Sequence, residues 1–314
     1  MQRNSNKNNN FIYGLLGEPT AAKASGLTYS LAAVGSVVLA FFFMMMLAVA
    51  GVTVEEGREP DWYLYCSFLM TPLVFGIVAA LSMGWTKTSW KTETKRQKCK
   101  VRYFFIAIAL QVGLLSLSEL NTLFLEFLAR FGYQDTPIRL PSMDGFGFVG
   151  VMLAVALLPA VFEEIIFRGF LLKGMDCFGT VGAVLLCGGL FALYHQNPAQ
   201  TVYQFCCGAA FALVAIRSGS ILPTVVSHFI NNALIITLTK LGLETFTKPV
   251  FITVLCISVI CLVGSLAWLI FFEKRTLDET SKDKKSGRKN LFKFAALGIA
   301  LCSLTWFGVL LSGI

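Results

Sequence analysis

Nine long apolar stretches, separated by short polar segments, constrain this chain more than any other feature. A helix needs about 20 apolar residues to cross a bilayer, and in lipid every backbone polar group must be paired within the protein. The chain is 56% hydrophobic and 14% charged, whereas soluble domains are about 25% charged. We predict an all-α polytopic membrane protein with eight or nine transmembrane helices around a polar cavity. The candidate spans are 27–52, 62–85, 102–117, 148–172, 180–195, 201–216, 220–240, 249–272 and 292–313.

The chain divides into a polar tail at 1–26 and one transmembrane domain at 27–313. The first ten residues, MQRNSNKNNN, are too polar for a cleaved signal peptide. No internal repeat is evident. Nine cysteines, an odd number, lie mostly inside apolar runs without a CxxC motif, so we expect neither a disulfide framework nor a cysteine metal site.

The net charge of +8 indicates membrane topology rather than nucleic-acid binding. Most Lys and Arg residues lie in or beside two connections between spans, 86–101 and 273–291. Basic connections of this kind mark the cytoplasmic side of a membrane. With a cytoplasmic N-terminus both connections fall inside, and the acidic connection 53–61 falls outside.

One segment does not resemble a span. In 118–131 apolar residues repeat at helical spacing, and Ser118, Glu119 and Arg130 occupy the other face. This pattern predicts an amphipathic helix at the membrane interface. Such a helix can be a simple connector or a lid over a cavity. The apolar positions are Leu120, Leu123, Phe124, Phe127, Leu128 and Phe131.

Ionisable residues within the spans are the most informative, because each costs about 2.5–3.5 kcal/mol at mid-bilayer unless it faces a cavity or a partner. Three spans carry such clusters. The chain has only two histidines, and each lies in a different span. One cluster alone can simply tie two helices together, whereas three convergent clusters indicate a site. The clusters are Glu163, Glu164 and Arg168 in the first, His195 in the second, and His228, Asn231 and Asn232 in the third.

Helical spacing suggests a role for each of these residues. Glu164 and Arg168 are four apart, so they share a face and can pair. Glu163 lies about 100° around the helix from its neighbour and can point into a cavity as a general base. His228 and Asn232 are also four apart and could stabilise one oxyanion together.

The three motifs, in this order, resemble the CAAX-protease and bacteriocin-processing family of intramembrane endopeptidases. That family carries EExxxR, FxxxH and HxxxN on successive membrane helices. Here they read Glu163 to Arg168, Phe191 to His195, and His228 to Asn232. The resemblance covers roughly 145–240, and we expect the catalytic core there.

The resemblance implies hydrolysis of a peptide bond in a membrane-associated protein or peptide. By analogy, Glu163 and His195 activate water, while Glu164 and Arg168 support the first carboxylate. His228 and Asn232 then stabilise the oxyanion. We expect no cofactor; zinc at His195 and His228 is the alternative, since some relatives are described as metalloenzymes. The expected partners are the substrate and the lipid bilayer, not nucleic acid, and the expected location is a bacterial cell membrane.

Two other functions stay open at this stage. The same fold could serve as a non-proteolytic membrane scaffold or a bacteriocin-immunity protein. Intramembrane Glu, His and Arg also build proton relays in transporters, although paired broken helices in two matching halves are not evident.

The topology can be tested by cysteine labelling in intact cells. We expect single cysteines at Thr88 and Ser286 to be protected from an impermeant thiol reagent, and one at Gly57 to react, because the basic connections face the cytoplasm. Labelling of the first two from outside would overturn this orientation.

Overall fold

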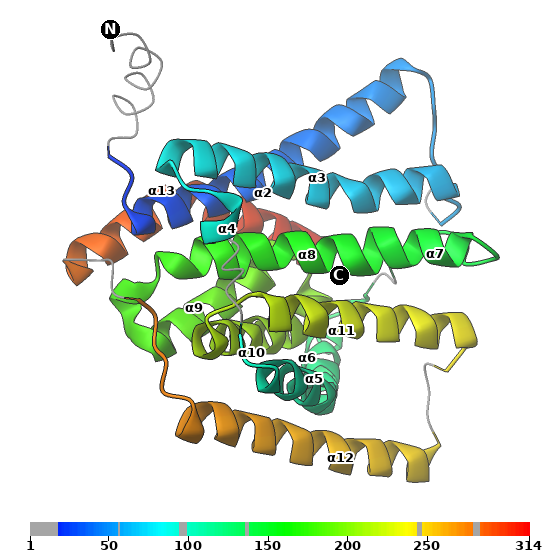
Figure 1. The fold of residues 1–314 in the computed structure, drawn as a ribbon. Coiled ribbons are helices and arrows are strands. Elements are labelled where there is room, and N and C mark those ends of the chain that lie inside the picture. Colours follow the sequence, from blue (N-terminus) through cyan, green and yellow to red (C-terminus); the bar gives the residue numbers. More distant parts are fainter. Residues whose placement is uncertain (1–17, 56, 94–98, 136–137, 244–246, 279–282) are drawn as a thin grey trace, which may run out of the picture.

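The computed structural model describes the chain apart from residues 1–17, 56, 94–98, 136–137, 244–246 and 279–282 (Figure 1). The expected polar tail therefore lies mostly outside the described residues. The described part contains helices and no strand. The helices are α2 Ala21–Val49, α3 Asp61–Thr86, α4 Trp90–Glu93, α5 Arg102–Leu114, η1 Leu115–Leu117, α6 Ser118–Ala129, α7 Gly147–Val151, η2 Met152–Leu157, α8 Leu158–Glu164, η3 Ile165–Leu171, η4 Asp176–Phe178, α9 Gly179–Tyr194, η5 Pro198–Gln200, α10 Thr201–Ser218, α11 Leu222–Leu241, α12 Lys248–Ala267, η6 Trp268–Phe272 and α13 Lys284–Ser312.

Within the described ranges, nine helical stretches are long and apolar enough to cross a membrane. The predicted class, an all-α polytopic membrane protein, is confirmed. One boundary error is at α13, which begins at Lys284 rather than near 292. The Asp283 side chain accepts hydrogen bonds from the Lys285 and Ser286 amides, and this N-cap extends the helix into the expected loop 273–291.

The prediction for 118–131 was partly wrong. The expected short span 102–117 and the amphipathic segment form one helical stretch, Arg102–Ala129, because the turn η1 joins α5 directly to α6. Most apolar side chains of α6 are exposed, with Leu123 60% and Phe127 51% exposed, although Leu128 is buried. The charged residues Glu119 and Glu126 are exposed as well, while Asn121 hydrogen-bonds the Ala199 carbonyl. The exposed apolar side chains suit a helix that faces lipid.

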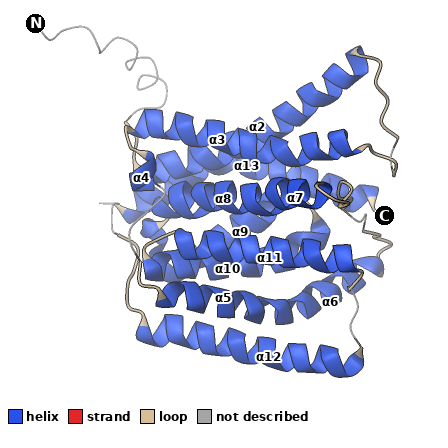
Figure 2. Cartoon of the chain, turned by 45° about the vertical axis from the view of Figure 1, so that its right-hand side comes forward, coloured by secondary structure: helices blue, strands red, loops and turns tan. Residues whose placement is uncertain are grey.

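The two basic connections lie at the same end of the bundle. Figure 2 shows α4 and the α12–α13 connection at one end, and the α2–α3 connection at the other. Arg102 forms an ion pair of 2.8 Å with Glu273, so the two connections also touch. Glu273 accepts further hydrogen bonds from Tyr103 and Trp268. Burial alone would raise the pKa of Glu273, but the hydrogen bonds it accepts outweigh burial and hold that pKa below its usual range.

The first and last spans pack against each other through small residues. Helices α2 and α13 lie side by side, and Ser30 Oγ donates to the Phe294 carbonyl at 2.6 Å and accepts from the Gly298 amide at 3.0 Å. A Cβ at Gly298 would lie 2.7 Å from Ser30 Cα, and one at Gly26 would overlap the Leu291 carbonyl oxygen. Small residues are what allow membrane helices to approach this closely.

An aromatic core fixes the central helices. Phe167 lies between the rings of Phe75 on α3, Phe191 on α9 and Tyr194 at the end of α9, with centroid distances of 6.2, 4.9 and 5.6 Å. Tyr29 on α2 contacts the same ring at 6.4 Å. Edge-to-face geometry dominates these pairs, and it orients rings more strictly than area burial does. These ring contacts therefore fix how the helices that carry the polar motifs are rotated about their axes.

We expect Gly26→Ala to lower the thermal stability of the detergent-solubilised protein, because the added methyl forces α2 and α13 apart at a cost of about 1–3 kcal/mol. Gly84→Ala is the matched control, since no atom lies within 4 Å of a Cβ there. Equal melting temperatures for the two variants would contradict the close α2–α13 contact.

Candidate active site

The predicted pair between Glu164 and Arg168 is present and completely buried. Arg168 Nη1 lies 2.9 Å from Glu164 Oε1, and neither side chain is exposed. Arg168 Nη2 donates to the Gly208 carbonyl at 3.2 Å, and the guanidinium lies 4.4 Å from the centroid of the Phe191 ring. The pair thus joins the first motif to α9 and α10. Its charges are compensated inside the bundle rather than exposed to lipid.

His228 is anchored by the same carboxylate. Its Nδ1 lies 3.1 Å from Glu164 Oε1. Because an ionised carboxylate only accepts hydrogen bonds, Nδ1 carries the proton in this contact. The other ring nitrogen, Nε2, is then directed elsewhere, and Glu163 Oε2 lies 3.9 Å from it. Sequence spacing placed His228 beside Asn232, but it did not show this tie between α11 and the first motif.

Glu163 is a nearly buried carboxylate with an unpaired oxygen. Its side chain is 12% exposed, and its Oε2 has no hydrogen-bond partner in the described part of the chain. A buried carboxylate oxygen without a partner is costly. It is therefore suited to hold a water molecule or a reacting group.

His195 lies just beyond the end of α9 with its ring fixed by the backbone. Its Nδ1 is 2.8 Å from the Phe191 carbonyl oxygen, so Nδ1 donates and Nε2 is left to accept. The next residue, Gln196, has φ +53°, a left-handed conformation that is uncommon outside glycine. Asn197 then accepts from the Ala199 amide and starts η5. This sharp corner turns the chain directly after His195.

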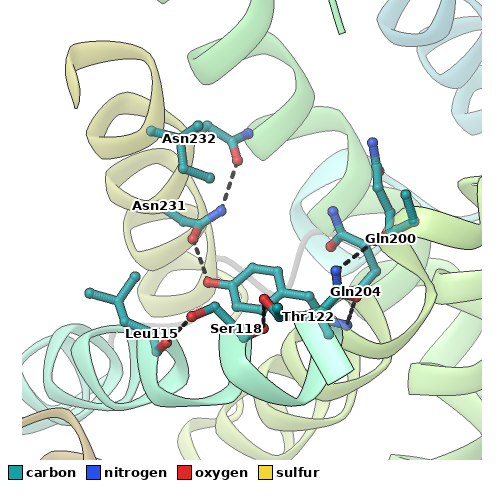
Figure 3. Close-up of a pocket in the computed structure, with 11 residues that line it drawn as sticks. Leu115, Ser118, Thr122, Gln200, Gln204, Asn231 and Asn232 are labelled. Carbon is teal, nitrogen blue, oxygen red and sulfur yellow. Dashed lines mark hydrogen bonds between the residues drawn. The ribbon is translucent and has the colours of Figure 1, made fainter. Parts of the chain in front are cut away.

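The two asparagines of the third motif form a chain of amides that sequence reasoning did not predict (Figure 3). Asn231 Oδ1 accepts from Gln111 Nε2 at 2.6 Å and from the Tyr203 hydroxyl at 3.0 Å. With its oxygen occupied, Asn231 donates from Nδ2 to Asn232 Oδ1 at 3.1 Å. The amide group of Asn232 is consequently oriented so that its NH₂ donates to the Val155 carbonyl at 3.5 Å. The sequence analysis did not single out Gln111; a glutamine in the middle of an apolar span is the signal that could have found it.

The helix that carries the first motif is irregular. The stretch Gly147–Leu171 contains two π-helical segments, η2 and η3, on either side of α8. Segments of this type rotate the side chains that follow them and recur at functional sites. Glu163 and Glu164 lie at the end of α8, between the two segments.

The metal alternative has little support from the donor arrangement. Among the residues that the structure describes, no three His, Cys, Asp or Glu side chains are grouped so that they could hold a metal ion. His228 Nδ1 is already committed to Glu164. We therefore assign no step to a metal.

The segment that holds all three motifs matches a known protein family. The match covers residues 145–234, and the family is described as type II CAAX prenyl endopeptidase Rce1-like. This segment is similar to that family. The resemblance expected from the three motifs is confirmed there, and the match ends just after Asn232. Comparisons with the curated proteins and with solved structures gave no match.

The matched segment also contacts spans that lie outside it. Gln111, which holds Asn231, comes from α5 outside the matched residues. Ser36 of α2 likewise hydrogen-bonds Tyr194, the residue before His195, at 2.7 Å. The flanking spans therefore help to orient the motif residues.

We expect Arg168→Ala to reduce the amount of folded protein in the membrane sharply, because it leaves the Glu164 charge buried without its partner, a cost of about 3–5 kcal/mol. Arg58→Ala is the matched control, since Arg58 pairs with Glu55 while 78% exposed and such pairs contribute little. Quantitative blotting of membrane fractions measures the difference. Normal levels of Arg168→Ala would show that the pair is not needed for folding.

Proposed function

We propose that this protein is an intramembrane endopeptidase that hydrolyses a peptide bond in a membrane-associated protein or peptide. The observation that carries the proposal is the unpartnered, nearly buried Oε2 of Glu163. It lies beside the anchored ring of His228, on the helix that matches an endopeptidase family. The class of activity follows the family, and the roles below follow the local geometry.

Glu163 and His195 activate the attacking water in this proposal. Glu163 accepts a proton from water, and the oxygen adds to the scissile carbonyl carbon. The C–N bond then breaks as the leaving nitrogen takes up that proton, so Glu163 returns to its ionised form. His195 accepts a hydrogen bond from the same water through Nε2, because its Nδ1 is held by Phe191. Glu164 and Arg168 support the carboxylate of Glu163, because their ion pair holds the helix that carries it.

His228 and Asn232 stabilise the oxyanion. The Nδ1 proton of His228 is directed at the Glu164 carboxylate, so in this proposal the donor to the oxyanion is a second proton on Nε2. Asn232 donates from an amide that does not titrate, and its NH₂ is oriented by Asn231. Fixed donors of this kind need no reorganisation during the reaction.

Water activation in this proposal requires no metal. Activity should then survive exhaustive chelation. Loss of activity, with recovery on adding one equivalent of zinc, would favour the metal alternative at His195 and His228.

We also propose a bacterial cell membrane as the location, with a cytoplasmic N-terminus, and place no requirement for a prenyl group on the substrate.

Glu163→Gln should abolish peptide cleavage at near-normal abundance, because the amide is nearly isosteric but cannot accept the proton. The measurement is mass spectrometry of membrane and released peptides from cells that carry either form. Peptides cut only with the native protein identify the substrate. Unchanged peptides, with a membrane partner still captured by both forms, would indicate a scaffold instead.

Asn232→Ala should lower kcat by about 10²–10³ with little change in KM, since one oxyanion donor is lost. Asn232→Asp should be at least as damaging, because a carboxylate repels the oxyanion. Asn231→Ala should be milder than Asn232→Ala, since Asn231 faces Gln111 rather than the reacting group. Steady-state kinetics on the purified variants would disprove the assignment if Asn232→Ala were silent.

A further inference from the structure

A cavity of about 430 Å³ lies directly beside the candidate active site. Two of its walls continue from motif residues. On one side, α11 carries Asn232 one turn beyond His228; on the other, η5 follows the sharp corner after His195 and ends at Gln200. Figure 3 shows the asparagines of α11 and the glutamines Gln200 and Gln204 on opposite sides of this space. Any substrate that reaches Asn232 therefore has this cavity next to it.

The lining of the cavity is polar but carries no charge. None of the eleven described residues that line it is ionised at neutral pH. The hydroxyls of Ser118 and Thr122 donate to their own helix. Carboxamides dominate the remaining polar groups. They belong to Asn121, Gln200, Gln204, Asn231 and Asn232.

Two of these carboxamides are free to bind a ligand. Asn121 is committed to the Ala199 carbonyl and the Tyr203 amide, and Asn231 is held by Gln111 and Tyr203. By contrast, within the described part of the chain the side-chain amides of Gln200 and Gln204 have no hydrogen-bond partner. Gln200 ends η5, Gln204 lies in the first turn of α10, and both line the same cavity.

A side-chain carboxamide is the same chemical group as a peptide bond. It offers one oxygen acceptor and an NH₂ donor, so it can satisfy both polar groups of an extended backbone residue. An extended segment cannot satisfy those groups itself, and leaving them unpaired in a membrane is costly. A charged side chain in the same space would find no opposite charge.

We propose that this cavity binds an uncharged, extended stretch of the substrate peptide next to the scissile bond, through the amides of Gln200 and Gln204. This inference rests on the proposed function and adds a substrate class to it: peptides with a neutral residue at the position that enters the cavity. Asn121 and Tyr203 form the rigid wall behind the two glutamines.

Specificity is tested with the full-length protein in lipid nanodiscs and a randomised library of short peptides. Peptides that the native protein cleaves should lack Asp, Glu, Lys and Arg at one fixed distance from the cleaved bond. Gln204→Glu should admit Lys and Arg there by about tenfold, because close charge pairs across an interface couple strongly. Gln134→Glu, at an exposed position outside the cavity, should leave the profile unchanged. If native cleavage tolerates charge everywhere, or both variants share one profile, the inference is wrong.

Binding is tested separately from cleavage. A photo-crosslinking phenylalanine analogue at Thr122, which lines the cavity, should capture a neutral library peptide even in the Glu163→Gln background. The same group at Leu123, which is 60% exposed on the lipid-facing side, should not. Capture at Thr122 without any native cleavage would support the cavity and overturn the proposed activity. Cleavage without capture at Thr122 would overturn the cavity alone.

Discussion

The buried pair between Glu164 and Arg168 is the interaction on which the rest of the site depends. Two opposite charges share a space from which solvent is excluded, and both side chains also contact other helices. Arg168 reaches the backbone of α10, and Glu164 reaches the ring of His228 on α11. Because an unpaired charge there would be very costly, the three helices can pack in only one arrangement. That arrangement leaves Glu163 beside His228 with an oxygen unpaired.

The site shows two different ways to orient a side chain in a membrane protein. Each histidine is fixed by one hydrogen bond that its Nδ1 donates, to a carboxylate in the case of His228 and to a backbone carbonyl in the case of His195. The asparagines are fixed through a series, in which Gln111 and Tyr203 occupy the oxygen of Asn231 and thereby decide which end of Asn232 is presented. In both cases one polar atom of the side chain serves for orientation, and the other stays available for the reaction. Outer-shell partners commonly act in this way on reactive histidines.

In the proposed enzyme the charged groups and the cavity that binds the peptide are in different places. Charged groups cluster at the first motif, while the adjoining cavity is lined by neutral amides and hydroxyls. A peptide bond is neutral in the ground state and acquires a negative oxygen during hydrolysis. A neutral binding cavity beside a charged reaction centre therefore favours the transition state without holding the substrate tightly.

The sequence by itself determined the fold class, nearly all the spans and the Glu164–Arg168 pair, because hydrophobic length and the i, i+4 spacing are local properties. It also singled out Glu163, His195 and His228, since ionisable groups are rare in apolar spans. Only the tertiary structure decided the rest. The contact between His228 and Glu164 joins residues 64 positions apart, and Gln111 meets Asn231 across 120 positions. No periodicity encodes such distances, because they depend on how three helices pack. The joining of α5 to α6 was likewise decided by the tertiary structure, in which Asn121 hydrogen-bonds the Ala199 carbonyl on η5.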